Sequence, residues 1–231
     1  MRTAAILPVK SFARAKQRLG ESVDEELRLQ LAGAMVADVL FALAQTEAIE
    51  LTIVVTREQP VAQAARSQGA IVLAEQAESG QSAAVTLGIE RALAEGIERV
   101  LCIPGDCPAL DPAELESLLT STTPESAGEV VIVPDRHGTG TNGLLLSPPD
   151  AIAPSFGADS CERHRALAHE AGLRCRLEAP SSLLLDIDTG ADLTALRERL
   201  AGAHARASST RLVLGQPALE DHLLTGSGSS S

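Results

Sequence analysis

The stretch Val100–Leu110, VLCIPGDCPAL, decides how the rest of the chain is read. Its first four residues, Val100–Ile103, are apolar and predict a short buried strand that Pro104 and Gly105 end. Asp106 then lies at the carboxyl end of that strand, and ligands of open α/β sheets bind outside the carboxyl ends of strands. A carboxylate there suits a hard cation such as Mg²⁺. The alternative is that Gly-Asp is an ordinary turn and Asp106 only caps a loop.

Apolar runs typical of strands alternate with amphipathic patterns typical of helices on both sides of this stretch. The expected strands are Thr3–Val9, Leu51–Thr56, Ala70–Leu73, Val100–Ile103, Glu129–Val133, Leu144–Ser147, Gly172–Leu177 and a short one at Leu183–Leu185. The expected helices are Val23–Ala44, Gln59–Gln68, one that ends near Glu95, Pro112–Leu119 capped by Asp111, one from about Ser160 to Gly172, and Leu193–Leu200. The alternation predicts an α/β protein with a mostly parallel sheet.

The length of 231 residues suits one α/β domain with a tail. We expect a single domain over residues 1–205 and a partly flexible C-terminal extension over residues 206–231, which ends in GSGSSS. Within the extension, Leu212–Leu214 is expected to add a small strand or to pack loosely. No apolar run approaches the ~18 residues that span a bilayer, and the N-terminus lacks the apolar length of a signal peptide. A cytoplasmic protein is therefore expected.

The composition narrows the class of partner. The net charge is −12, and the chain has two lysines, three Phe and no Trp or Tyr. Nucleic-acid binding needs a basic footprint and aromatic platforms, so the composition argues against a nucleic-acid partner. The four cysteines show no CxxC spacing, which argues against a zinc site or a redox pair. Small molecules are the expected partners, and a homodimer stays open.

Positive charge is concentrated directly after the first expected strand, in Lys10–Gly20, KSFARAKQRLG. This segment holds both lysines and no acid, and its four cations are Lys10, Arg14, Lys16 and Arg18. The first βα loop of a nucleotide-binding fold meets phosphates through backbone N–H groups and cationic side chains. The alternative is a solvated basic helix, and the placement of all lysines at the carboxyl end of a strand weighs against it.

A second acidic strand end is the segment 186–189, DIDT, which follows Leu183–Leu185. Alternation along an extended chain places Asp186 and Asp188 on one side. Two carboxylates on one side repel each other unless a cation or hydrogen-bond donors lie between them. Together with Asp106 they form a candidate divalent metal site. Asp188 or the threonine after it can also cap the next helix.

Two glycine-containing segments are candidates for ligand contacts. Residues 80–82, GQS, precede an apolar helix and can bind a ligand through their N–H groups and hydroxyl, or form a plain N-cap. The glycines of 138–143, GTGTNG, match G-x-G-x-x-G, but the dinucleotide fingerprint must open a helix and here another strand follows. We expect a loop whose amides and threonine hydroxyls contact an anionic ligand, or a glycine-rich hairpin.

Further candidates lie around the helix that starts near Ser160. A hydroxyl and exposed amides at a helix start can hold phosphate or carboxylate. His164 and Arg165 lie on that helix, and each can either reach the site or face solvent. His137 lies beside a turn, where a histidine is more often structural than a general base.

Three features converge on one chemistry: the cationic first loop, Asp106 at one strand end, and Asp186 with Asp188 at another. They suit in-line attack on the α-phosphate of a nucleoside triphosphate, with Mg²⁺ held by the carboxylates and the cations neutralising the pyrophosphate that leaves. The sequence shows no serine or cysteine nucleophile with an oriented base.

The ordered motifs of the chain resemble those of the CofC-like 2-phospho-L-lactate / phosphoenolpyruvate guanylyltransferases of coenzyme F(420) biosynthesis. The matching segments are 8–10 (PVK), 15–19 (AKQRL), 105–108 (GDCP), 134–135 (PD), 140–142 (GTN), 156–157 (FG) with Ser160 and His164, and 186–189 (DIDT). The set covers roughly residues 3–200 and is specific through its order.

This resemblance implies a MobA-like nucleotidyltransferase (nucleotide-diphospho-sugar transferase) fold, a three-layer sandwich around a mostly parallel mixed sheet. It implies transfer of GMP from GTP to a phosphorylated three-carbon acid. The acceptor is phosphoenolpyruvate, 2-phospho-L-lactate or 3-phospho-D-glycerate. The preference for Arg over Lys and the high Ala content are typical of a GC-rich bacterial genome, and bacterial members of the family resemble phosphoenolpyruvate users, so phosphoenolpyruvate is favoured.

The resemblance also implies the site residues. Two Mg²⁺ ions are bound by Asp106, Asp186 and Asp188. The triphosphate is faced by Lys10, Arg14, Lys16 and Arg18, of which the two lysines act in catalysis with Asp106. The guanine is met by Gly80 and Ser82, although the family often has Gly-Leu-Asn where this chain has Gly-Gln-Ser. The acceptor is contacted by Thr141, Gly157 and Ser160.

Other interpretations stay open. A molybdenum-cofactor guanylyltransferase shares the implied fold, but its LAGGxSxRMG start is absent. A nucleotide-binding regulatory module without turnover is disfavoured by the three aspartates and both lysines. A structural α/β domain with incidental acidic turns would show no Mg²⁺-dependent affinity for nucleotides.

Overall fold

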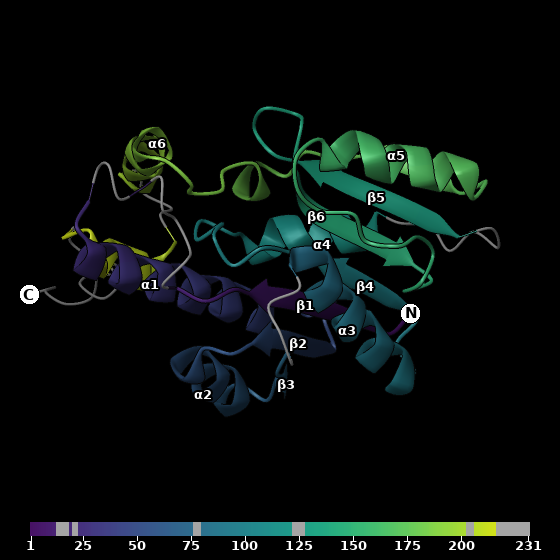
Figure 1. Ribbon diagram of the computed structural model, residues 1–231, viewed down its shortest axis with the longest axis horizontal. Helices are drawn as coiled ribbons and strands as arrows, with labels where there is room; N and C mark the ends of the chain where they lie inside the picture. The colour runs from purple at the N-terminus through teal and green to yellow at the C-terminus, as the bar shows by residue number, and fades with distance from the viewer. Residues whose placement is uncertain (13–18, 20–22, 76–79, 122–127, 202–205, 216–231) are drawn as a thin grey trace, which may run out of the picture.

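The computed structural model describes residues 1–12, 19, 23–75, 80–121, 128–201 and 206–215. They form a seven-stranded mixed sheet with helices on both faces, which confirms the α/β prediction (Figure 1). The strand order is β3-β2-β1-β4-β6-β5-β7, and β6 runs antiparallel to both its neighbours while the other pairs are parallel. The strands are β1 (Thr3–Val9), β2 (Leu51–Thr56), β3 (Ile71–Leu73), β4 (Arg99–Cys102), β5 (Glu129–Pro134), β6 (Thr141–Ser147) and β7 (Arg174–Leu177).

The helices sort onto the two faces because successive side chains of a strand point to opposite sides. On one face the sheet packs against α1 (Glu25–Ala44), α2 (Gln59–Ser67) and α4 (Pro112–Thr120). On the other face it packs against α3 (Gln81–Ala94) and α5 (Ser160–Glu170). In β1, for example, Leu7 joins the first face and Ile6 the second. Asp111 caps α4 as expected, since its Oδ1 accepts from Ala113 N at 2.8 Å.

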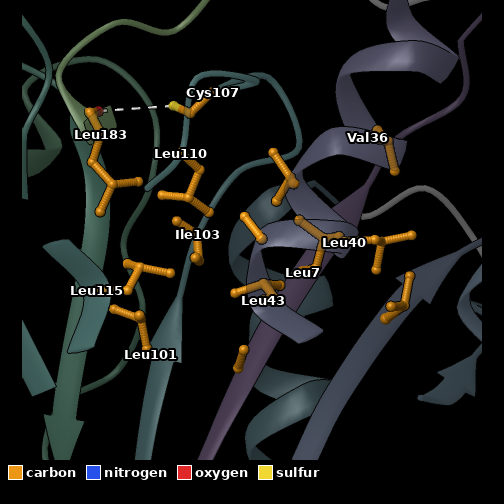
Figure 2. Packing of buried hydrophobic residues seen from close by; sticks show 14 of the residues in the cluster. Leu7, Val36, Leu40, Leu43, Leu101, Ile103, Cys107, Leu110, Leu115 and Leu183 are labelled. Atoms are coloured by element: carbon orange, nitrogen blue, oxygen red, sulfur yellow. Dashed lines mark hydrogen bonds between the residues drawn. The ribbon is translucent and has the colours of Figure 1, made fainter. Parts of the chain in front are cut away.

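Figure 2 shows how the first face is filled. The α1 residues Val36, Leu40 and Leu43 pack around Leu7 of β1. A second group of side chains comes from β4, α4, the segment between them and the segment before Asp186. That second group consists of Leu101, Ile103, Leu110, Leu115 and Leu183. Apolar contacts therefore run without interruption from α1 across the sheet to the segment that precedes Asp186.

A third cluster of buried side chains, here called the edge cluster, lies beyond the carboxyl ends of the strands. It draws on α1, the segment after β4, and α6 (Gly190–Leu200). Its buried members are Leu19, Leu31, Met35, Ala109, Leu185, Ile187, Leu193, Leu196, Leu200 and Ala207. The loops that carry the predicted carboxylates are thus anchored by a small core of their own.

The short strand expected at Leu183–Leu185 was a wrong prediction. Residues Ser181–Leu183 form a 3₁₀ helix instead. The carbonyl of Leu183 accepts from Asn142 Nδ2 at 2.8 Å and from Cys107 Sγ at 3.8 Å, so side chains replace a neighbouring strand as its partners. Leu183 packs in the first face and Leu185 in the edge cluster, so their apolar character reflects burial rather than sheet pairing.

The segment around Leu212–Leu214 forms a helix, α7 (Ser208–Val213), and not the small strand considered from the sequence. The buried carboxylate of Asp38 on α1 accepts from Ser209 N at 2.9 Å and Thr210 N at 2.8 Å. A carboxylate at these N–H groups satisfies donors that a helix start leaves without an intrahelical acceptor. Helix α7 is therefore tied to α1 by polar as well as apolar contacts.

Helix α1 is long and apolar enough to cross a membrane by length and composition. In the fold its apolar side chains pack against the sheet on one side and the edge cluster on the other. The composition of α1 is thus explained by its place in the core.

Gly88 of α3 tests the contact between that helix and β1, because a Cβ added there would lie 2.5 Å from Ile6 Cγ2. We expect Gly88→Ala to lower the free energy of unfolding by about 1–3 kcal/mol, since overpacking outweighs the roughly 1 kcal/mol of helix propensity that alanine adds. Urea denaturation followed by circular dichroism measures the change. Glu90→Ala, on the exposed side of α3, is the control. A Gly88→Ala protein that is more stable than the parent would contradict the close contact.

Candidate functional site

The carboxyl ends of β1 and β4 lie side by side and carry the first two candidate residues. The strands pair in parallel as far as Ile6 opposite Cys102, and Ile103 N donates to Ile6 O at 3.1 Å. Lys10 follows directly after β1 and is exposed, while Asp106 follows β4 after a turn and is half-buried. One edge of the sheet therefore presents both a cation and a carboxylate.

A backbone hydrogen bond joins the Asp106 loop to the second acidic segment. Ile187 N donates to Asp106 O at 3.1 Å, and the Ile187 side chain is fully buried in the edge cluster. On the neighbouring strand β6, Asn142 Nδ2 donates to Asp186 Oδ1 at 3.1 Å. Three segments that are distant in sequence thus meet around Asp186.

The electrostatics of this meeting point raise the pKa of Asp186 above its ordinary value. Burial is the largest cause, the negative charge of Asp106 comes next, and the charge of Asp188 adds to both. The hydrogen bond from Asn142 acts in the opposite direction. Like charges at this spacing favour the protonated carboxyl unless a cation compensates them, so a bound cation would relieve the repulsion.

The first turn of α6 positions Asp188. Thr189 is the N-cap and forms a capping box with Asp192, whose Oδ2 accepts from Thr189 N at 2.7 Å. The same oxygen accepts from Asp188 N at 3.1 Å, and Asp192 Oδ1 pairs with Arg136 Nη2 at 2.6 Å. Thr189 rather than Asp188 therefore caps this helix.

The donor atoms at this edge are hard carboxylate oxygens, which suit Mg²⁺. Within the described ranges, no three or more His, Cys, Asp or Glu side chains stand together as a preformed metal cluster. Mg²⁺ usually binds through one or two carboxylates and completes its shell with water and substrate phosphates. The interacting pair Asp106 and Asp186, with Asp188 nearby, fits that mode of binding rather than an all-protein cage.

Thr141, the first residue of β6, contacts two side chains of α5. Ser160 Oγ donates to Thr141 Oγ1 at 3.0 Å, and His164 Nδ1 lies 3.1 Å from the same oxygen. All three residues are buried. Alternation along β6 directs Thr141 toward α5 and Asn142 toward Asp186 on the other face. The start of one strand therefore serves two groups of candidate residues.

The loop 155–158 is held against this cluster from α5. Ser155 N donates to His164 Nε2 at 2.9 Å, and Arg163 Nη2 donates to Ser155 O at 2.9 Å. Arg163 also donates through Nη1 to the carbonyl of Ala158. Gly157 has φ 115°, a backbone conformation that favours glycine. The loop is thus fixed by side chains of the helix that follows it.

The start of α3 is linked directly to the same loop. Gly80 is the N-cap of α3 and has φ 96°, and Ser82 lies in the first helical turn. Ser82 Oγ accepts from Phe156 N at 2.9 Å. The serine hydroxyl therefore bridges two segments instead of capping its own helix. Ser82, which is expected at the guanine, is thus bonded to the residue that precedes Gly157, which is expected at the acceptor.

The chain that leads from β1 into the cationic segment is anchored on two sides. Phe12 N donates to Glu58 Oε1 at 2.9 Å, and Arg28 Nη1 donates to Phe12 O at 3.0 Å. Lys10 lies two residues before this anchor. The remaining predicted cations lie outside the described residues; they are Arg14, Lys16 and Arg18.

The glycine-rich segment 138–143 lies in the hairpin that joins β5 to β6, and its last three residues already belong to β6. Asp135 Oδ1 accepts from His137 N at 3.1 Å and Thr139 N at 2.9 Å, so the hairpin uses these amides itself. A Cβ at Gly140 would lie 2.7 Å from Asp135 Oδ2, which explains the glycine. These contacts favour the plain hairpin over an anion-binding loop. His137 is exposed.

Asn142 and Arg163 contact candidate site segments, and the sequence analysis gave neither a role. His164 contacts Thr141, and the sequence analysis did not decide whether His164 reaches the site or faces solvent. The sequence signal that could have indicated a role for Asn142 is the polar pair Thr141-Asn142, which directly precedes the apolar part of β6. The structure distinguishes the two α5 side chains whose orientation the sequence left open: His164 is fully buried, whereas Arg165 is exposed and pairs with Glu162.

Comparison with known proteins gives a consistent family. The chain matches the family model "Guanylyl transferase CofC like" over residues 3–212. A phosphoenolpyruvate guanylyltransferase from Conexibacter woesei is 49% identical over 217 residues, which cover 94% of this chain and 96% of the relative. A 2-phospho-L-lactate guanylyltransferase from Methanothermobacter thermautotrophicus is 34% identical over 206 residues, which cover 89% of each chain.

The fold has solved relatives as well. A protein from Desulfovibrio desulfuricans G20 assigned as a nucleotide-diphospho-sugar transferase superposes with a TM-score of 0.72 at 20% identity and covers 93% of this chain and 95% of that one. A nucleotidyl transferase from Methanothermobacter has a TM-score of 0.64 at 20% identity, with 86% of this chain and 97% of that one covered. These likenesses confirm the predicted nucleotide-diphospho-sugar transferase fold. The family match and the relatives of 49% and 34% identity together show that the chain belongs to the CofC-like guanylyltransferases, a family of nucleotidyltransferase enzymes.

Proposed function

We propose that this guanylyltransferase transfers GMP from GTP to a phosphorylated three-carbon acid and releases pyrophosphate. The observation that carries the proposal is the meeting of Asp106 and Asp186 at the sheet edge where Lys10 also lies. Carboxylates that repel each other next to a cation suit a metal-bound triphosphate. The names of the relatives support guanylyl transfer in particular.

The chemistry needs little from the protein beyond positioning. An oxygen of the acceptor's phosphate attacks the α-phosphorus of GTP and forms a new P–O bond. The bond between the α-phosphorus and the oxygen that bridges to the β-phosphate breaks, and pyrophosphate leaves with the electron pair. A phosphate monoester is largely ionised at neutral pH, so no protein base has to activate it.

The carboxylates of Asp106, Asp186 and Asp188 would hold Mg²⁺, two ions in the form we expect. Bound Mg²⁺ neutralises charge on the phosphates and thereby makes the α-phosphorus easier to attack. Within the protein, Asn142 orients Asp186, and the backbone bond from Ile187 holds the Asp106 loop beside it. These contacts keep the ligands in place before substrate arrives.

The other subsites follow from the elements around this edge. Lys10 and Lys16, with Arg14 and Arg18, are proposed to neutralise the β- and γ-phosphates and the pyrophosphate that leaves. Gly80 and Ser82 at the start of α3 are proposed to meet the guanine. The acceptor is proposed to lie against Thr141, Gly157 and Ser160.

Phosphoenolpyruvate is the favoured acceptor, because the relative with 49% identity carries that substrate in its name. The relative named for 2-phospho-L-lactate is 34% identical, and 3-phospho-D-glycerate shares the same pair of anionic groups. We place the reaction in the cytoplasm, as a step of coenzyme F(420) biosynthesis that acts on small molecules and involves neither nucleic acid nor membrane. A homodimer is compatible with this reaction.

Pyrophosphate release with GTP and Mg²⁺ against a panel of the three acceptors tests the proposal, with ATP and CTP as controls. Release that needs GTP and one acceptor would support the proposal and identify the substrate. Release with another nucleotide or acceptor would favour a different nucleotidyltransferase of this fold. Nucleotide binding without release in any mixture would favour a regulatory module.

Asp106→Asn tests the carboxylate at the end of β4. We expect kcat to fall about 100-fold or more, because the metal loses a charged ligand where charge develops in the transition state. Steady-state pyrophosphate release at saturating GTP measures the effect, and circular dichroism reports on the fold. Asp150→Asn, on an exposed residue away from this edge, is the matched control. A near-normal kcat for Asp106→Asn would contradict the metal assignment.

The burial of Asp186 and the neighbouring charge of Asp106 predict a gain in stability when the charge of Asp186 is removed. A carboxyl whose folded-state pKa is raised destabilises the fold while it is ionised, so Asp186→Asn should raise the free energy of unfolding at pH 7.5 in EDTA. The gain should shrink as the pH falls through the raised pKa, where the parent carboxyl is itself neutral. Urea denaturation at several pH values measures both effects.

Asp192 is the matched control for that measurement. Burial by itself would raise the pKa of Asp192, but hydrogen bonds from Thr189 and Asp188 and the charge of Arg136 lower it overall. Asp192→Asn should therefore destabilise the fold at pH 7.5, and the difference should shrink at acid pH. Equal signs for the two variants would contradict the electrostatic account of this edge.

A further inference from the structure

The hydrogen bonds of His164 extend from the acceptor residues to the loop beside them. His164 has no exposed surface, Ser160 is 1% exposed and Thr141 is 7% exposed. On one side of the ring, Nδ1 lies 3.1 Å from Thr141 Oγ1; on the other, Nε2 accepts from Ser155 N at 2.9 Å. A single imidazole therefore touches both a hydroxyl and a loop of the proposed acceptor subsite.

The backbone partner fixes the tautomer of the ring. A backbone N–H can only donate, so Nε2 of His164 must carry a lone pair and no hydrogen. Burial, with a smaller contribution from the charge of Arg163, lowers the pKa of His164 to about 4, which keeps the ring neutral near pH 7. A neutral imidazole carries one hydrogen, and here it must lie on Nδ1. His164 therefore donates through Nδ1 to Thr141 Oγ1.

A count of hydrogens then shows what the cluster can offer a ligand. The ring N–H and the two hydroxyls of Thr141 and Ser160 supply three hydrogens, while two contacts join these groups. One hydroxyl hydrogen therefore remains for a partner outside the cluster. In the part of the chain that the structure describes, Thr141 Oγ1 and Ser160 Oγ make no further hydrogen bond that would use it.

The surroundings place this hydrogen near the carboxyl ends of β4 and β5, which Asp106 also follows. Thr141 opens β6 at the same edge as Asp106, and its neighbour Asn142 holds Asp186. The Phe156 ring packs edge-on against the His164 ring, with centroids 5.1 Å apart and an interplanar angle of 73°. This packing restricts the rotation of the imidazole.

We infer that His164 is a positioning residue of the acceptor subsite, and that its Nδ1–H tautomer directs one hydroxyl hydrogen of the Thr141–Ser160 pair onto an anionic oxygen of the acceptor. The inference rests on the proposed function for the identity of that acceptor. The imidazole neither touches the substrate nor takes a proton from it. It fixes the direction of a donor and, through Ser155, the position of the loop that contains Gly157.

Two substitutions separate the two ends of the ring. In His164→Asn the side-chain amide can take the place of Nδ1 and keep a donor to Thr141. In His164→Gln the amide reaches the place of Nε2, so that it can keep the contact with Ser155 N but loses the donor to Thr141. We expect His164→Gln to raise the KM for the acceptor about 10-fold or more, with the KM for GTP within about 2-fold of the parent. Without the Nδ1–H donor, the spare hydroxyl hydrogen is free to turn away from the acceptor, and a directed hydrogen bond to a charged group is lost.

His164→Asn should restore most of the affinity for the acceptor, and Thr141→Val should reproduce the loss that His164→Gln causes. Equal increases in the KM of acceptor and GTP, or a smaller loss with His164→Gln than with His164→Asn, would overturn the inference. A parent protein that turns over none of the three acceptors would instead count against the proposed function.

The tautomer can be measured without any turnover. Long-range ¹⁵N–¹H correlation spectra of the full chain at pH 7.5, without substrate, distinguish Nδ1–H from Nε2–H in each histidine. The resonances of His164 are assigned by replacing each of the other four histidines with glutamine, which leaves His164 intact. An Nδ1–H ring supports the inference, and an Nε2–H or doubly protonated ring overturns it whatever the enzyme's substrate proves to be.

Discussion

The burial of the Asp186 carboxylate beside the charge of Asp106 is the constraint on which this end of the molecule depends. The backbone bond from Ile187 to Asp106 brings the two carboxylates together, and the buried Ile187 side chain keeps that bond away from water. Asn142 offsets part of the unfavourable charge by donating to Asp186. The edge cluster beneath these loops supplies apolar contacts that hold the arrangement in place. The raised pKa of Asp186 means that its ionised form lowers the stability of the fold.

The antiparallel strand β6 brings two further polar residues, Thr141 and Asn142, to the carboxyl ends of β4 and β5. Because β6 runs against its neighbours, its first residues lie at the carboxyl ends of β4 and β5. Thr141 faces α5 and His164, whereas Asn142 faces Asp186, so adjacent residues contact the proposed acceptor residues and a proposed metal ligand. Ser82 adds a direct bond from α3 to the acceptor loop. Hydrogen bonds therefore link the residues of the proposed guanine, acceptor and metal subsites at the carboxyl ends of the parallel strands.

Much of the fold could be predicted from the sequence, because the apolar periodicity of its strands and helices is strong. The strand at Leu183–Leu185 was predicted wrongly, since an apolar run shows that a segment is buried but not what satisfies its backbone. The carbonyl of Leu183 bonds to Asn142 and Cys107, and neither contact has a local signal. The order of the strands and the antiparallel direction of β6 could not be predicted from the periodicity of apolar residues, because both depend on contacts between segments that are distant in the sequence.

The sequence by itself determined the strand-end position of Asp106, the second acidic segment, the concentration of positive charge in Lys10–Gly20 and, through its ordered motifs, the family. These are local properties, since each depends on residue type and spacing along one segment. Only the tertiary structure decided that Asp186 lies beside Asp106 and that His164 is buried while Arg165 is exposed. The tautomer of His164 is decided at the same level, because it follows from one backbone N–H, that of Ser155, placed against the ring by the fold. Hydrogen-bond direction and pKa depend on what surrounds a group in space, which the order of residues along the chain does not show.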